Sequence, residues 1–159
     1  MLRIEAIPDE ASLLAVQARA LFRQYSDFLR AKLACGTFNF AKFDEEIAAL
    51  PAPYTALNGE VLLALSDDVP AAVISYRATL APQTCEIKRL YVHPDYRGKR
   101  LSRTLVTLVL DRARTRNFTQ AILDTDTINM PEAHALYLSL GFIEYTRDEH
   151  HLAFLERAL

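Results

Sequence analysis

Several residue types are scarce in this chain, and each scarcity narrows the class of protein to which it can belong. Only two of the 159 residues are cysteines, which excludes a disulfide-rich secreted fold. The four histidines show no metal-ligand spacing with either cysteine, so we expect no metal. No apolar run approaches the roughly 20 residues that cross a bilayer, and the first residues do not resemble a signal peptide. We therefore expect a cytoplasmic protein with reduced thiols and no membrane partner.

Charge of either sign is not in large excess. Lys and Arg number 18, Asp and Glu number 20, and the net charge is −2. This balance disfavours a general nucleic-acid binder, so we expect no nucleic-acid partner. The alternative, that the locally basic residues 97–116 bind nucleic acid, would require duplex binding that persists at physiological salt. No Gly-x-Ser-x-Gly or P-loop pattern occurs, so hydrolase and NTPase functions lack support.

Periodicity predicts a mixture of strands and helices in one domain of residues 1–159. Hydrophobic residues make up 51% of the chain and charged residues 24%, as is typical of globular proteins. Strands are expected at residues 2–7, 61–65, 71–79, 84–92, 120–125, 142–146 and 152–155. Helices are expected at residues 9–33, 44–50, 99–116 and 131–140. Residues 54–59 are expected to form a flexible loop that covers a substrate.

The segments at residues 84–92, 99–116 and 120–125 form a predicted β-α-β unit. Its two strands should be parallel, with a right-handed crossover. Ligands of such units bind beyond the carboxyl ends of the strands. The predicted helix starts immediately after a turn and carries Arg97, Gly98, Lys99, Arg100 and Arg103. Free N–H groups and cationic side chains at a helix start suit a phosphate or pyrophosphate, although a solvated, arginine-rich helix start is the simpler alternative.

Two motifs in this half of the chain resemble those of a known family. The first reads Glu86-Ile87-x-x-Leu90-x-Val92-x-Pro94-x-Tyr96-Arg97-Gly98-Lys99, with Leu101 and Leu105 following. It resembles the acyl-CoA-binding motif of the GNAT superfamily of N-acyltransferases. The second reads Ala133-x-x-Leu136-Tyr137-x-x-Leu140-Gly141-Phe142 and is similar to the C-terminal motif of that family. Their order along the chain is also that of the family.

The resemblance implies both a fold and a reaction. The fold is α/β (α+β): a GNAT-like, mixed, mostly antiparallel, twisted sheet of six or seven strands, with about four helices on both faces and a splayed parallel strand pair that binds acyl-CoA. The reaction is N-acetyl transfer from acetyl-CoA, the cosubstrate, to a primary amine on a small-molecule or peptide acceptor, directly within a ternary complex and without a metal.

Resemblance also assigns residues to the cosubstrate. Backbone groups of Leu90, Tyr91 and Val92 are expected to pair with pantetheine and polarise the thioester carbonyl. The pyrophosphate is expected at Arg97, Gly98, Lys99, Arg100, Leu101, Ser102 and Arg103. Asn129 lies next to the position where the family often has asparagine, which Met130 occupies here. Arg100 and Ser102 replace small residues of the family's phosphate loop. These departures motivate the alternative of a non-catalytic acyl-CoA-binding or interaction domain.

Two further residues match catalytic positions of the family. Glu86 matches a carboxylate that acts as general base in some members, and its alternative role is a rim carboxylate paired with Lys88 or Arg89. Tyr137 matches the tyrosine that commonly protonates the CoA thiolate, and its alternative role is packing at the edge of the core. For a phenol with a pKa near 10, an alkyl thiolate is a suitable proton acceptor.

Other polar and aromatic residues have less defined expectations. Lys88, Arg89 and Arg77 either face the acceptor and favour a carboxylate on it, or are solvated. We interpret Phe22, Tyr25 and Phe28 as core residues, with an aromatic ligand site as the alternative, because the segment after the first strand often walls the acceptor site in the GNAT family. No role is assigned to Asp124 and Asp126, and the acceptor itself is not decoded. An exposed final strand would allow a homodimer.

Overall fold

The computed structural model describes residues 1–34 and 36–159, in which seven strands and five α-helices occur. The strands are β1 (Leu2–Ala6), β2 (Glu60–Ser66), β3 (Val69–Ala78), β4 (Thr84–Val92), β5 (Gln120–Asp126), β6 (Ile143–Arg147) and β7 (Leu152–Ala158). The helices are α1 (Leu13–Lys32), α2 (Phe40–Ala48), α3 (Ala52–Thr55), α4 (Leu101–Thr115) and α5 (Pro131–Ser139), with a short 3₁₀ helix η1 (Pro94–Tyr96).

One mixed sheet contains all of these strands, in the order β1-β2-β3-β4-β5-β7-β6. Each neighbouring pair is antiparallel except β4 and β5, which are parallel. This arrangement confirms the predicted fold class. The last strand of the chain, β7, lies inside the sheet, so the exposed edge on this side is β6.

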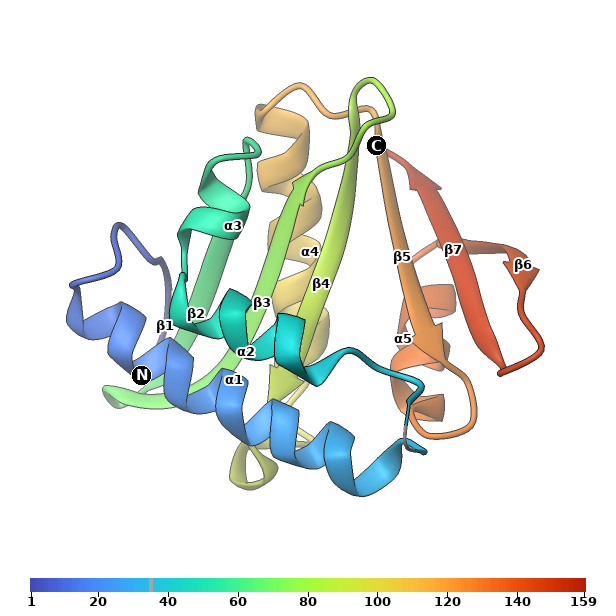
Figure 1. Cartoon of the computed structure of the whole chain (residues 1–159). Coiled ribbons are helices and arrows are strands. Elements are labelled where there is room, and N and C mark those ends of the chain that lie inside the picture. Colours follow the sequence, from blue (N-terminus) through green and yellow to red (C-terminus); the bar gives the residue numbers. More distant parts are fainter. Residues whose placement is uncertain (35) are drawn as a thin grey trace.

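Helices cover both faces of the sheet (Figure 1). On β2, Val61, Leu63 and Leu65 pack with α1, α2 and α3, whereas Leu62 and Ala64 pack with α4 and α5. This alternation follows from the period of two along a strand. Because both faces are buried, β2 is an almost continuous apolar run, and the chain forms two hydrophobic layers that fix the sheet between them.

The parallel pair β4 and β5 separates soon after it begins. Its ladder contains only three pairs: Thr84 with Gln120, Cys85 with Ala121, and Glu86 with Ile122. Beyond these pairs the two strands run apart, as Figure 1 shows. Near their carboxyl ends, α1 packs against β4 and α5 packs against β5. Backbone groups of β4 that would face β5 therefore have no partner strand there.

Helix boundaries depart from the sequence predictions at three places. The first helix begins at Leu13 because Ser12 caps it, with Ser12 Oγ accepting a hydrogen bond from the N–H of Ala15 at 3.1 Å. The second begins at Phe40 rather than residue 44 and is capped by Asn39. The predicted loop at residues 54–59 is partly wrong, because α3 extends to Thr55 and Tyr54 is fully buried.

The described residues bear on the expectations about thiols, a membrane and a metal. Burial raises the pKa of the free Cys85 thiol to about 12, so this thiol stays protonated. Cys35 lies outside the described residues. In the part of the chain that the structure describes, no helix combines the length and apolarity needed to cross a membrane, and no cluster of three or more His, Cys, Asp or Glu is placed to hold a metal.

Candidate active site

Two cavities meet where β4 and β5 separate. The first, of about 820 Å³, lies between α1, the end of β4, the start of α4 and the start of α5. The second, of about 900 Å³, lies over the middle of β4 and the end of β5. Both are lined by Tyr25, Leu90, Asn129, Met130 and Ala133. A molecule in one cavity would therefore contact a molecule in the other beside these five residues.

A tight turn brings the backbone of α4 to the first cavity. His93 begins η1, and its Nδ1 accepts a hydrogen bond from the N–H of Asp95 at 3.3 Å. Gly98 and Arg100 then adopt positive φ angles of 75° and 59°. A Cβ atom at Gly98 would meet no atom within 4 Å, so the space beside this residue is open. Helix α4 has no side-chain cap, and its first N–H groups are free to bind an anion.

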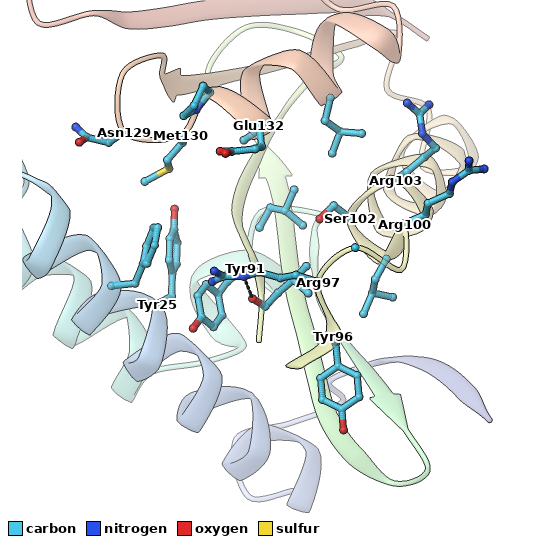
Figure 2. A pocket seen from close by; sticks show the side chains of 18 of the residues that line it. Tyr25, Tyr91, Tyr96, Arg97, Arg100, Ser102, Arg103, Asn129, Met130 and Glu132 are labelled. Atoms are coloured by element: carbon cyan, nitrogen blue, oxygen red, sulfur yellow. Dashed lines mark hydrogen bonds between the residues drawn. The ribbon is translucent and has the colours of Figure 1, made fainter. Parts of the chain in front are cut away.

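All but one of the residues expected to hold the cosubstrate line the first cavity: Leu90, Tyr91, Val92, Arg97, Gly98, Arg100, Leu101, Ser102, Arg103 and Asn129. The exception is Lys99, whose Nζ lies 5.2 Å from the centre of the Tyr96 ring. Figure 2 shows Ser102 facing the cavity, whereas Arg100, which precedes α4, and Arg103 in its first turn extend away from Met130.

Several of these side chains are held by contacts of their own. Arg97 Nε donates to the carbonyl oxygen of Val92 at 3.0 Å, which folds the guanidinium back over the end of β4. Arg103 Nη2 donates to Ser139 Oγ at 2.6 Å and so links α4 to α5. Asn129 Nδ2 donates to an oxygen of Asp126 at 2.8 Å, which leaves the amide oxygen of Asn129 available.

Tyr137 and Glu86 both line the second cavity. Tyr137 is only 7% exposed, and its ring contacts Phe142 at a centroid distance of 5.7 Å. No described residue forms a hydrogen bond with its hydroxyl, yet no fully buried side-chain oxygen among the described residues lacks a partner, so Oη must reach the cavity. Burial raises the pKa of Tyr137, with smaller contributions from Tyr25 and Asp124, and the phenol stays protonated.

Glu86 is the last residue of β4 that pairs with β5. Its side chain is 25% exposed, and its Oε1 lies 3.8 Å from Nζ of Lys88. The carboxylate thus stands at the point where the strands begin to separate, with a cation beside it. This contact was the expected alternative to a catalytic role, and the position in the cavity is compatible with both.

A bulge in β4 lies between the two cavities. The register of β3 and β4 shifts after Val73, and Arg89 adopts a positive φ of 63°, which is unfavourable for a residue other than glycine. Glu46 holds Arg89 in this conformation by accepting two hydrogen bonds, one from Nε at 3.0 Å and one from Nη2 at 2.8 Å. The Tyr54 hydroxyl donates to Glu46, and the guanidinium lies 4.2 Å from the centre of the Phe43 ring.

A family model described as "Acetyltransferase (GNAT) family" matches residues 18–142. The chain belongs to the GNAT family. An uncharacterized N-acetyltransferase of Schizosaccharomyces pombe is 32% identical over 104 residues, which are 65% of this chain and 63% of that protein. The N-acetylaspartate synthetase of Homo sapiens is 30% identical over 90 residues, 57% of this chain and 30% of that protein. This GNAT chain thus spans less than two thirds of the length of these curated relatives.

Solved structures of GNAT proteins share the fold over nearly the whole chain. An acetyltransferase from Streptococcus agalactiae superposes with a TM-score of 0.79 at 22% identity, covering 99% of this chain and 98% of the other. An N-acetyltransferase from Thermoplasma acidophilum, solved in complex with coenzyme A, gives a TM-score of 0.74 at 16% identity, covering 100% and 99%.

Sequence reasoning missed two residues of the GNAT site. Tyr25 of α1 stacks on Tyr91 at a centroid distance of 5.4 Å and faces Met130 across the first cavity (Figure 2). Burial raises the pKa of Tyr25 to about 12, although the charge of Arg89 opposes this rise. Tyr25 and Phe28 line the first cavity, whereas Phe22 is a core residue as predicted. Helical spacing alone could not separate them, because all three lie on one apolar stripe.

Asp124 of β5 is the second missed residue. It lies on the wall of the second cavity, where partial desolvation raises its pKa; Lys88 opposes this shift and Glu86 reinforces it. Asp126, two residues on, accepts the N–H groups of Ile128 and Asn129 instead. The sequence does contain a signal, since Asp124 is a carboxylate that follows the last residue of β5 paired with β4. The signal could not be used, because residue types do not tell how many residues of the two strands pair.

The buried pair of Arg89 and Glu46 gives a first prediction. Their side chains are 13% and 10% exposed, so Glu46→Gln leaves an uncompensated buried cation and should lower the free energy of unfolding by about 3–5 kcal/mol. The exposed pair of Arg30 on α1 and Asp44 on α2 is a matched control, because Asp44→Asn changes a carboxylate of the same helix and should cost about 0.5 kcal/mol or less. Urea denaturation measures both values, and equal losses would contradict the argument.

This prediction has a defined pH dependence. Burial tends to raise the pKa of Glu46, but hydrogen bonds and charge from Arg89 outweigh it, and the net shift is downward from 4.5. The contribution of the ion pair is therefore full above pH 4.5 and is lost as the pH falls through the lowered pKa. The difference between wild type and Glu46→Gln should shrink over that interval.

Asp124 and Asp126 should respond in opposite directions to the same substitution. The raised pKa of Asp124 penalises the folded state as the pH rises above 3.8, so Asp124→Asn should increase the melting temperature at pH 7, and the gain should vanish at low pH. Asp126 has a lowered pKa, since hydrogen bonds from Asn129 and Ile128 outweigh burial. Asp126→Asn should cost about 1–3 kcal/mol at pH 7. Calorimetric scans at both pH values test the pair.

Proposed function

We propose that this GNAT chain is an N-acetyltransferase that moves an acetyl group from acetyl-CoA to a primary amine by direct transfer in a ternary complex. The observation that carries the proposal is the meeting of two cavities beside Leu90, at the point where β4 and β5 separate. One cavity suits the cosubstrate and the other suits the acceptor. Residues 1–159 would form one catalytic domain around this point.

The first cavity fits acetyl-CoA. Its pyrophosphate would lie on the free N–H groups at the start of α4, beside the open space at Gly98, with Arg97, Arg100 and Arg103 supplying positive charge. Ser102, in the place of a small residue of the family, faces the cavity with a short side chain. Arg100 meets the backbone requirement of the loop with its positive φ, and its side chain extends away from Met130. Neither departure closes the cavity.

Pantetheine would run along the end of β4. Beyond Glu86, the edge of β4 that faces β5 is not paired with it, so backbone groups of Leu90, Tyr91 and Val92 are available to a ligand. The bulge at Arg89 turns this part of the strand toward the junction of the two cavities. Asn129 lines the same junction and could contact the ligand through its amide oxygen.

The reaction requires two proton transfers. Glu86 would accept a proton from the acceptor amine, directly or through water, as the nitrogen attacks the thioester carbonyl. Backbone N–H groups at the end of β4 would stabilise the oxyanion. The C–N bond forms and the C–S bond breaks, and Tyr137, whose raised pKa keeps the phenol protonated, would donate its proton to the departing thiolate.

The acceptor is a small-molecule or peptide amine. A relative named N-acetylaspartate synthetase makes aspartate one acceptor to screen. A homodimer stays a prediction, and its contact strand would be the exposed edge β6, on which Ile143 and Tyr145 are 68% and 54% exposed. Cytoplasmic location likewise stays a prediction.

Occupation of the first cavity can be tested by filling it from α4. Ser102→Trp places a large ring in the cavity and should abolish the calorimetric signal for acetyl-CoA and CoA. Thr107→Trp on the exposed side of the same helix, which does not line the cavity, is the control and should bind as wild type does. If Ser102→Trp binds with wild-type affinity, the cosubstrate site has been misplaced.

Catalysis by Tyr137 can be separated from binding. Tyr137→Phe should lower kcat for thiol release by about 10²-fold or more, with little change in acetyl-CoA affinity, because the ring remains while the proton donor is lost. Tyr145→Phe on β6 is the matched control. Acetyl-CoA binding without thiol release by the wild-type protein, across a panel of primary amines, would favour the alternative of a non-catalytic acyl-CoA-binding domain.

A further inference from the structure

The second cavity has more acidic than basic side chains on its wall. Five carboxylates line it: Glu86, Asp124, Asp126, Asp148 and Glu149. Among the described residues that line it, only Lys88 and Arg89 carry a permanent positive charge. This imbalance runs opposite to the acceptor suggested by Lys88, Arg89 and Arg77 in the sequence. Arg77 does not line the cavity, because it lies over the Tyr54 ring and donates to the carbonyl oxygen of Pro53.

Both cations are already matched by carboxylates. Arg89 forms its two hydrogen bonds with Glu46, which itself does not line the cavity, so the guanidinium offers little net charge to a ligand. Lys88 lies 3.8 Å from Glu86. After these pairings the cavity keeps a net negative charge from the remaining carboxylates.

Asp124 is the carboxylate that is most available to a ligand. No described residue donates a hydrogen bond to it or forms an ion pair with it, and it is exposed to the cavity. By contrast, Asp126 accepts N–H groups of Ile128 and Asn129, and Asp148 accepts N–H groups of His150 and Leu152. Asp126 and Asp148 therefore stabilise the local backbone as hydrogen-bond acceptors, whereas Asp124 has no such structural role.

An independent feature of this cavity suits a polar ligand. The hydroxyl of Tyr137 reaches the same cavity, has no hydrogen-bond partner among the described residues, and belongs to a side chain that is more than nine-tenths buried. Tyr25 and Phe38 add aromatic rings to the wall, and aromatic faces attract cations.

We propose that the acceptor is a primary amine that carries a second positive charge, which Asp124 binds while the reacting nitrogen lies near Tyr137. This inference rests on the proposed acetyl transfer and specifies its acceptor class. The two charges have different roles: the reacting nitrogen must be neutral to attack the thioester, whereas the distal ammonium stays protonated beside the carboxylate. An acceptor with a distal carboxylate would meet repulsion at the same position.

Three acceptors with one carbon skeleton separate these possibilities. 1,4-Diaminobutane, n-butylamine and 4-aminobutanoate place a positive, neutral or negative group at the far end of the same chain. We expect kcat/KM for thiol release to fall by about tenfold at each step in that order, which is the size of one partly screened charge interaction. Calorimetric titration of the CoA-bound protein with each compound should give the same order of affinity.

Substitution of single carboxylates identifies the charge that produces the preference for the diamine. Asp124→Asn should narrow the difference between 1,4-diaminobutane and n-butylamine to about threefold or less, because the neutral amide no longer attracts the ammonium. Asp111→Asn removes one carboxylate from the exposed surface of α4, outside the cavity, and should keep the full difference. Added salt should weaken the preference for the diamine in wild type.

Each outcome decides a separate point. Equal affinity for the three compounds, or tighter binding of 4-aminobutanoate, would overturn the acceptor class while leaving acetyl transfer intact. A preference for the diamine that Asp124→Asn does not reduce would also overturn the acceptor class. Binding of the diamine in the expected order without thiol release would support the charged cavity and reject the proposed reaction instead.

Discussion

The backbone of β4 turns at Arg89, and most of the site follows from this turn. A positive φ at an arginine costs free energy, so it persists only because surrounding contacts fix it. Glu46 supplies these contacts from α2, and Phe43 supports the guanidinium from the same helix. β4 pairs with β5 only as far as Glu86, and the unpaired edge beyond it, which includes this turn, becomes a surface for a ligand.

This contact also determines the electrostatics of the second cavity. Arg89 lines the cavity but is neutralised by a carboxylate that lies outside it, while Lys88 is matched by Glu86. Asp124 is left as the carboxylate on the wall that has neither an ion pair nor a hydrogen bond with another described residue. One buried ion pair therefore has two effects: it fixes the geometry of β4, where we propose that the cosubstrate binds, and it leaves the second cavity, the proposed acceptor site, with a net negative charge.

Much of this protein could be predicted from its sequence because two kinds of signal are local. Extended apolar runs bounded by turn residues located the strands, and the run from Glu86 to Gly98 located the turn before α4. The Glu46–Arg89 pair could not be predicted, because the two residues are distant in the chain and only the packing of α2 brings them together. Tyr25 was placed in the core for the same reason: its helical spacing is that of a packed residue, and its exposure to a cavity depends on where β4 and β5 separate.

The short ladder between β4 and β5 also affects how firmly the molecule is held together. Three residue pairs and the packing of α4 and α5 join the β1–β4 side of the sheet to the β5–β7 side. A cosubstrate bound along β4 would bridge this joint and take the place of the missing strand pairing. Ligand concentration then contributes directly to thermal resistance, by about 2.7 kcal/mol when acetyl-CoA is at 100 times its Kd. If acetyl-CoA binds as proposed, its level in a cell would set not only how fast this protein works but also how much of it stays folded and escapes proteolysis.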